Sequence, residues 1–228
     1  MPTTKRIYIF LGLLLACISG VMAQANDRIY RLEVGIDGGG CYYVGDANRT
    51  IFKNVRETYG ASFRYMFDRR WSVRAKGMYE HITGFYPDAY GVANVSLGRW
   101  NNRLTNIDAV GEFNFLPFGD VRYDSRISPI TPYIGIGIGV SLHGNFKKVA
   151  AYMPFIIGAK WRCAKHLTIH LAWQHNVYFS DGMENVEAYN NSYNLNGGNI
   201  MNMDVTGSLV LGFAVAFVQD GKVCRTCK

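Results

Sequence analysis

After residue 23 the sequence has no apolar run long enough to cross a membrane as an α-helix, which needs about 20 residues. It also has no dense stripe of lysine and arginine. The formal charge of +7 falls to +5 once Lys5 and Arg6, the two basic residues of the N-terminal segment described below, are removed. Because a mild excess without clustering attracts nucleic acid poorly, we expect no nucleic-acid partner.

Cysteine is scarce, and its spacing lacks the features of a metal or redox site. Cys41, Cys163, Cys224 and Cys227 follow the N-terminal segment. The last two have no second ligand pair, since Cys163 with His166 is a poor substitute, and no βαβ context typical of a thioredoxin. We therefore expect no metal and no cofactor. Cys163, Cys224 and Cys227 are assigned to a disulfide, to unpaired thiols or to contacts with a partner.

The N-terminus has the parts of a secretory signal peptide. Lys5-Arg6 precede an apolar run over 7–21, and small residues follow at the −3 and −1 positions of a cleavage site. We predict a cleavable signal over residues 1–23. Two alternatives stay open, namely an anchoring helix, for which the run is short, and a lipoprotein signal with its lipid on Cys17.

Alternation of apolar and polar residues predicts eight β-strands. In the fourth, Ile107, Ala109 and Phe113 share one face. The expected strands cover 31–43, 54–66, 71–82, 103–115, 130–142, 151–161, 167–179 and 204–217. Each is long enough to cross a bilayer at a tilt, and their number is even, as in bacterial barrels. We predict an all-β fold, an eight-stranded antiparallel transmembrane β-barrel over 24–217 with a periplasmic tail over 218–228.

Alternation does not by itself say which face is inside, and a soluble ligand-binding barrel would turn its apolar face inward. Two features favour a barrel in outer-membrane lipid. Aromatic residues collect at one end of the apolar face, as in an interface girdle: Tyr65, Trp71, Phe115, Trp161 and Phe217. The polar face carries both signs of charge, which can pair across a narrow lumen: Arg64, Arg74, Lys76, Asp108, Glu112 and Lys160. We expect the cell outer membrane as location.

Two glycine runs fit this barrel. The alternating glycines of 135–139 lie within a strand, with no helix to complete a phosphate-binding loop, so they are expected to make room for lumen side chains. The run Gly38 to Gly40 is interpreted as a bend or bulge. His170 is expected to point into the lumen as a hydrogen-bonding residue.

Catalysis and conduction are not expected. An eight-stranded barrel is just wide enough for its own side chains, which excludes a diffusion pore. A lipid-modifying enzyme is an alternative, with His175 on the lipid-facing side near the outer end of the seventh strand. A lone histidine there is more often an interfacial residue, and no serine or carboxylate can be assigned to it from spacing.

Several stretches resemble one family over most of the chain. They are Tyr43-Val44-Gly45-Asp46-Ala47-Asn48, Phe63-Arg64-Tyr65-Met66-Phe67, Glu112-Phe113-Asn114-Phe115-Leu116-Pro117-Phe118, Thr131-Pro132-Tyr133, Pro154-Phe155 and Gly158-Ala159-Lys160-Trp161. In order and spacing they resemble a family of small Bacteroidetes outer-membrane barrels that includes the type IX secretion component PorG.

The resemblance implies a noncatalytic part of type IX secretion that docks a periplasmic ring of PorK and PorN type. Arg69, Arg70, Asp120 and Arg122, in the expected inner turns, are the candidate docking residues. The unusually long turn over 116–129 suits a contact surface. The alternative function is an adhesion or envelope-integrity barrel that acts through its outer loops.

Overall fold

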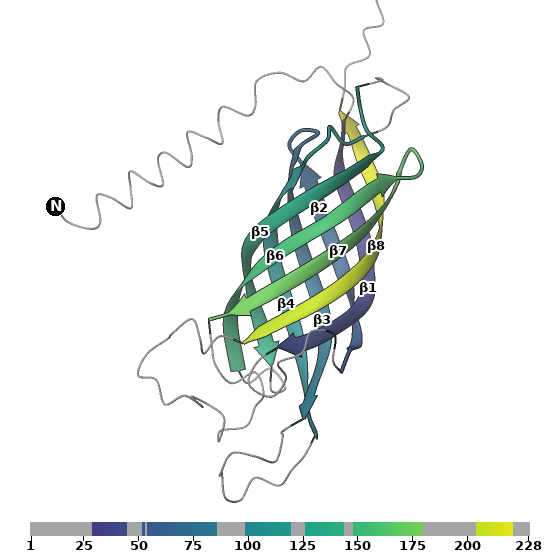
Figure 1. Ribbon diagram of the computed structural model, residues 1–228. Helices are drawn as coiled ribbons and strands as arrows, with labels where there is room; N and C mark the ends of the chain where they lie inside the picture. Colours follow the sequence, from purple (N-terminus) through teal and green to yellow (C-terminus); the bar gives the residue numbers. More distant parts are fainter. Residues whose placement is uncertain are drawn as a thin grey trace, which may run out of the picture.

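The computed structural model describes residues 29–44, 52, 54–85, 99–119, 126–143, 148–179 and 204–220. They form one closed antiparallel barrel in which each strand pairs with the next and β8 pairs back with β1 (Figure 1). The strands are β1 (Ile29–Val44), β2 (Arg56–Met66), β3 (Trp71–Phe85), β4 (Arg99–Asn114), β5 (Ile130–His143), β6 (Lys148–Arg162), β7 (Leu167–Tyr178) and β8 (Val205–Asp220). The predicted eight-stranded barrel is confirmed.

The glycine run in β1 corrects one expectation. Gly38, Gly39 and Gly40 keep regular partners on both neighbouring strands, so they form neither a bend nor a bulge. They serve close approach instead. A Cβ at Gly39 would lie 2.0 Å from the carbonyl oxygen of Leu209, which only glycine avoids.

The even number of strands places the start of β1 and the end of β8 at one end of the barrel, where Ile29 pairs with Asp220 (Figure 1). We call this the terminal end; it carries the connections over 67–70, 115–129 and 163–166. The opposite, loop end carries the connections over 45–55, 86–98, 144–147 and 179–204. Within the described ranges, no helix is long and apolar enough to cross a membrane.

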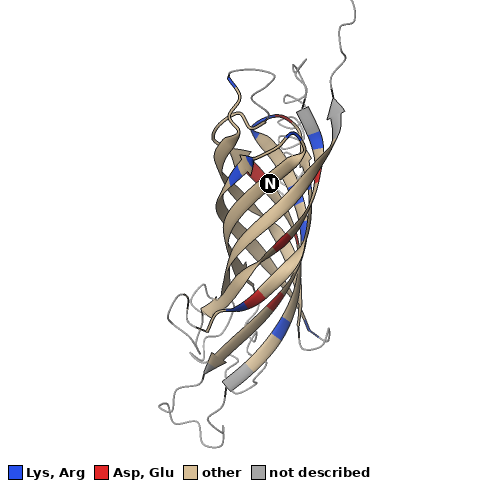
Figure 2. Cartoon of the chain, turned by 90° about the vertical axis from the view of Figure 1, so that its right-hand side faces the viewer, with Lys and Arg blue, Asp and Glu red and all other residues tan. Residues whose placement is uncertain are grey.

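The outward wall of the barrel is apolar. Ile36, Ile138 and Ile157 are 68%, 73% and 64% exposed, and charged residues are sparse along the strands (Figure 2). Four of the predicted girdle aromatics, Trp71, Phe115, Trp161 and Phe217, lie about half exposed on this wall. The inward side chains include buried arginine, lysine, glutamate and aspartate. This arrangement is the reverse of a soluble ligand-binding barrel, so the outer wall faces lipid.

Candidate functional site

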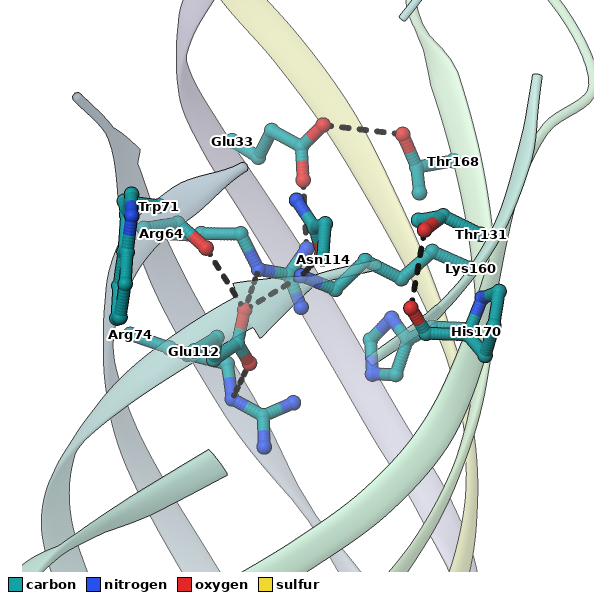
Figure 3. Close-up of polar contacts among 12 residues, drawn as sticks. Glu33, Arg64, Trp71, Arg74, Glu112, Asn114, Thr131, Lys160, Thr168 and His170 are labelled. Carbon is teal, nitrogen blue, oxygen red and sulfur yellow. Dashed lines mark hydrogen bonds and ion pairs between the residues drawn. The ribbon is translucent and has the colours of Figure 1, made fainter. Parts of the chain in front are cut away.

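The candidate site is the barrel interior, and its terminal half is organised around Glu112 of β4. The carboxylate of Glu112 forms ion pairs with three buried cations (Figure 3). The distances are 2.8 Å to Arg64 Nε, 3.0 Å to Arg74 Nε and 2.7 Å to Lys160 Nζ. Ser72 Oγ also donates a hydrogen bond to Glu112, at 3.1 Å.

Glu33 of β1 is the second anion of this cluster. Its two oxygens lie 2.6 Å from Arg64 Nη1 and 2.7 Å from Arg162 Nη2, and Thr168 Oγ1 donates to it at 3.0 Å. Arg64 therefore bridges Glu33 and Glu112 and joins β1, β2 and β4 across the lumen. We call Glu33, Arg64, Arg74, Glu112, Lys160 and Arg162 the charged cluster.

Strand register brings these residues to one level. Glu33 pairs with Arg64 on β2, and Arg64 pairs with Arg74 on β3. Glu112 reaches the same level from β4, where it pairs with Ser72. Because each charge is desolvated, the cluster is held by mutual pairing, and loss of one member leaves others unpaired in a low-dielectric lumen.

A second set of polar contacts fills the middle of the lumen. His170 Nε2 lies 2.7 Å from Asp37 Oδ1, both fully buried, which confirms that His170 points inward. Farther toward the loop end, Lys76 donates to Gln174, and Gln174 Nε2 donates to Asp108 Oδ2 at 3.2 Å.

Aromatic and aliphatic side chains close the loop end of the lumen. The buried residues there are Cys41, Tyr43, Ile82, Leu104, Ala150, Tyr152 and Tyr178. Tyr43 donates a hydrogen bond to Asp204, and Tyr152 Oη donates to Asp108 at 3.1 Å. The glycines of β5 allow this filling, although the side chains over them come from neighbouring strands: a Cβ at Gly139 would lie 2.4 Å from the Tyr152 ring.

The β4–β5 connection closes the terminal end. Phe118 is 1% exposed, packs with Met66 and lies under the Arg162 guanidinium, 5.1 Å from the ring centroid. Ile127 of the same connection is also buried. The two described parts of the connection, 115–119 and 126–129, are bonded to each other, because Ser128 N donates to Pro117 O at 2.8 Å. Both ends of the charged interior are therefore covered by apolar side chains.

The predicted docking residues lie at the terminal end where they are described. Asp68 Oδ1 accepts hydrogen bonds from the backbone N–H groups of Arg70 and Trp71, both at 2.6 Å, which fixes the β2–β3 turn. Arg70 Nη1 donates to Phe115 O at 3.1 Å, and Arg69 O accepts from Phe118 N at 3.0 Å. Asp120 and Arg122 lie outside the described residues.

The cysteines and His175 occupy different surroundings. Cys41 and Cys163 are free thiols in the described part of the chain, and Cys163 Sγ donates to Leu167 O at 3.5 Å. Cys224 and Cys227 lie outside the described ranges. His175 is half buried on the outward wall, with its ring 4.7 Å from that of Trp173.

Sequence reasoning identified most of the charged lumen but missed its end covers. The alternation placed Arg64, Arg74, Glu112 and Lys160 on one face, and all four are in the charged cluster. Phe118 was missed because it lies in a connection, where no period of two marks an inward side chain. Within the described residues no group of His, Cys, Asp and Glu is arranged to hold a metal ion.

A family model described as a domain of unknown function, DUF6089, matches residues 5–227. The chain belongs to the DUF6089 family. A comparison with curated proteins found no match.

Solved structures similar to this DUF6089 barrel include three bacterial proteins. They are Neisserial surface protein A (13% identity, 84% of this chain and 99% of that chain, TM-score 0.48), the attachment invasion locus protein Ail of Yersinia pestis (10%, 82% and 98%, 0.45) and the outer membrane protein OprG of Pseudomonas aeruginosa (14%, 81% and 95%, 0.45). Because the outer wall of this DUF6089 barrel is apolar and its interior is charged, the protein is a small β-barrel of the bacterial outer membrane.

Proposed function

We propose that this barrel is a noncatalytic component of type IX protein secretion that docks a periplasmic ring of PorK and PorN type at its terminal end. The proposal rests on the family resemblance of the sequence stretches and on one structural observation. That observation is the bonded, mainly basic surface formed by the β2–β3 turn and the described parts of the β4–β5 connection, 115–119 and 126–129. Bacterial barrels place their shorter turns in the periplasm, which orients this surface toward a periplasmic partner.

Hydrogen bonds between two segments and a set of exposed cations support a preorganised docking surface. The β2–β3 turn and the β4–β5 connection are bonded to each other through Arg69 O, Arg70 Nη1 and the backbone of 115–118. Arg70, Arg126 and Lys165 are exposed at this end. A rigid, cationic face binds an acidic partner with little loss of conformational entropy and gains association rate from charge complementarity.

The first experiment is deletion of the gene. Type IX cargo should then accumulate inside the cell, while proteins exported to the outer membrane by other routes arrive normally. Normal release of type IX cargo by the deletion strain would refute the proposal.

The second experiment locates the contact by crosslinked pulldown from isolated outer membranes. The double variant Arg70→Glu with Arg122→Glu should recover much less of the periplasmic ring proteins than the unmodified chain. Arg103→Glu, an equal change of charge per site at the loop end, is the control and should recover the same amount. Comparison of the gel migration of unheated and heated samples, which differs for a folded barrel, checks that both variants fold. Equal recovery by the double variant and the control would place the partner elsewhere.

A surface adhesion or envelope-integrity role is the second candidate. It is favoured by the long connections over 86–98 and 179–204 at the loop end. Trimming both connections should abolish adhesion or envelope integrity while type IX secretion continues. If trimming changes neither, this second function is wrong.

A further inference from the structure

Three buried donors near Glu112 have no hydrogen-bond acceptor within the described part of the chain. They are Nη2 of Arg64, Nη2 of Arg74 and the hydroxyl of Tyr133 on β5. All three side chains are buried, and that of Tyr133 is fully so. Because a donor that is removed from water without an acceptor is costly, buried donors of this kind are rare, and several together indicate a shared ligand.

The three donors lie at one level of the lumen. Arg64 and Arg74 are partners in the β2–β3 register, and their guanidinium groups lie on either side of the Glu112 carboxylate (Figure 3). Tyr133 belongs to the same level, because Lys160 Nζ lies 4.2 Å from its ring centroid and 2.7 Å from Glu112 Oε2. Tyr133 is also within electrostatic range of both arginines. The donors therefore surround one region of the lumen beside Glu112.

The electrostatic potential of this region favours a negative ligand. Arg64, Arg74 and Lys160 converge on the single carboxylate of Glu112. The next carboxylate toward the loop end, Asp37, is already engaged by the imidazole described above, at 2.7 Å. Since the groups that lack a partner are N–H and O–H donors beside converging cations, an acceptor with negative charge suits them better than water does.

We propose that the charged cluster binds one small monovalent anion, of which chloride is the simplest, between Arg64, Arg74 and Tyr133. Two guanidinium N–H groups and one O–H group donate hydrogen bonds to it. A larger or divalent anion is disfavoured, since an eight-stranded barrel leaves little room beside its own side chains and a second charge is costlier to desolvate. Because both ends of the lumen are covered, the ion enters as the barrel closes. The site is independent of the secretion role.

Urea unfolding of the full-length protein in lipid vesicles tests the site, because a ligand that binds only the folded state raises the folding equilibrium constant. Chloride replaces gluconate, a much larger anion, at constant ionic strength. Above the dissociation constant, each tenfold rise in chloride should raise the folding equilibrium constant of the unmodified protein about tenfold.

Tyr133→Phe is the test variant, because it removes one donor and leaves the ring in place. It should need about tenfold more chloride for the same rise, as expected for loss of one hydrogen bond to a charged ligand. In gluconate alone it should be as stable as the unmodified protein, since the hydroxyl has no acceptor among the described residues. A purely structural role of Tyr133 would instead lower stability equally in both salts, and this result would overturn the proposal.

Tyr178→Phe is the control. It removes a buried hydroxyl of the loop-end cover that accepts a hydrogen bond from Asn106, and its chloride response should equal that of the unmodified protein. Comparison of the gel migration of unheated and heated samples checks the folding of each variant. Arg74→Lys, which keeps a charge near Glu112 but lacks Nη2, takes the place of Tyr133→Phe if the latter does not fold.

Two further outcomes decide the proposal. An unmodified protein whose stability does not depend on chloride would show that water satisfies the donors, and the proposal would be wrong. In crystals grown with bromide, an anomalous peak beside the Tyr133 hydroxyl would support the site, whereas peaks at the protein surface alone would overturn it.

Discussion

Glu112 is the residue on which the interior depends most, because one carboxylate serves three buried cations. Arg64 has a second anion in Glu33, but Arg74 and Lys160 form their described ion pairs with Glu112. Lys160 has one further acceptor, Asn114 Oδ1 at 3.0 Å. Desolvated cations of this kind are costly once their counter-charge is gone.

We therefore expect Glu112→Gln to lower the free energy of unfolding by about 3–5 kcal/mol, the range found when one partner of a buried ion pair is removed. Glutamine keeps the shape of the side chain, so the loss reports charge rather than volume. Urea unfolding in lipid vesicles, followed by tryptophan fluorescence, measures it. Glu57→Gln, at a carboxylate that is 60% exposed, is the control and should change stability by less than about 0.5 kcal/mol. Equal losses in both variants would contradict this account.

At the scale of residues, the sequence predicts which side chains enter the lumen better than it predicts which of them form ion pairs. Its period of two assigns Arg64, Arg74 and Glu112 to one face, but the ion pair of a given cation depends on register around the whole barrel. His170 illustrates the limit. Its inward direction follows from alternation, whereas its partner Asp37 comes from β1, far away in the chain, and meets it only when the barrel closes.

At the scale of elements, the outward side of the closing strands is held by an aromatic contact. Tyr42 of β1 lies across Gly207 of β8, and its hydroxyl accepts a hydrogen bond of 2.9 Å from Trp173 Nε1 on β7. Phe52, with a left-handed φ of 63°, packs its ring 4.9 Å from that of Tyr42. The contact joins three strands, and it requires a residue without a side chain at position 207.

Gly207→Val should break this contact, because a Cβ there would lie 2.2 Å from the Tyr42 ring. The ring must move away and lose its bond to Trp173, so we expect a loss of about 1–3 kcal/mol in unfolding free energy. Gly77→Val is the matched control, since nothing lies within 4 Å of a Cβ at that lipid-facing glycine. Urea unfolding measures the free energy of unfolding of each variant, and only Gly207→Val should show the loss. A stable Gly207→Val beside an unstable Gly77→Val would show that the contact is unimportant.

We expect the order of the segment 115–119 to depend on Phe118 and not on Phe115. Phe118 is 1% exposed beneath Arg162, whereas Phe115 is 46% exposed on the lipid-facing wall. Phe118→Ala should cost about 3 kcal/mol and speed hydrogen exchange over 115–119, because a buried ring is removed. Phe115→Ala should leave exchange there nearly unchanged. Similar exchange in both variants would mean that Phe118 does not fix the connection.

Element positions were largely predictable, and the exceptions have physical causes. The start of β3 at Trp71 and of β7 at Leu167 agree with the alternation. β4 begins at Arg99, ahead of the expected Arg103, because Arg99 to Asn102 pair with 82–85 of β3 without an apolar alternation. Pairing with an extended neighbour therefore lengthens a strand beyond its own sequence signal.

At the scale of the whole molecule, the side chains of the described strands fill the lumen and cover its two ends, which opposes a continuous water path. The apolar loop-end cover, the charged cluster and the Phe118 cover follow one another along the barrel. An eight-stranded barrel has an interior just wide enough for such side chains. Moving an ion through the lumen would require breaking several desolvated ion pairs at once, which makes conduction energetically unfavourable.

The folded protein should therefore give no steady single-channel current when reconstituted into a planar bilayer at moderate salt. Phe118→Ala should remain silent as well, because removal of the terminal cover leaves Glu112 paired with its cations and leaves the tyrosines of the loop end in place. Glu112→Gln combined with Phe118→Ala is the sensitised variant, since it removes both a cover and the counter-charge of the cluster. Currents that appear only in this double variant would support a seal formed by the cluster itself. Ohmic currents from the unmodified protein would contradict a closed lumen.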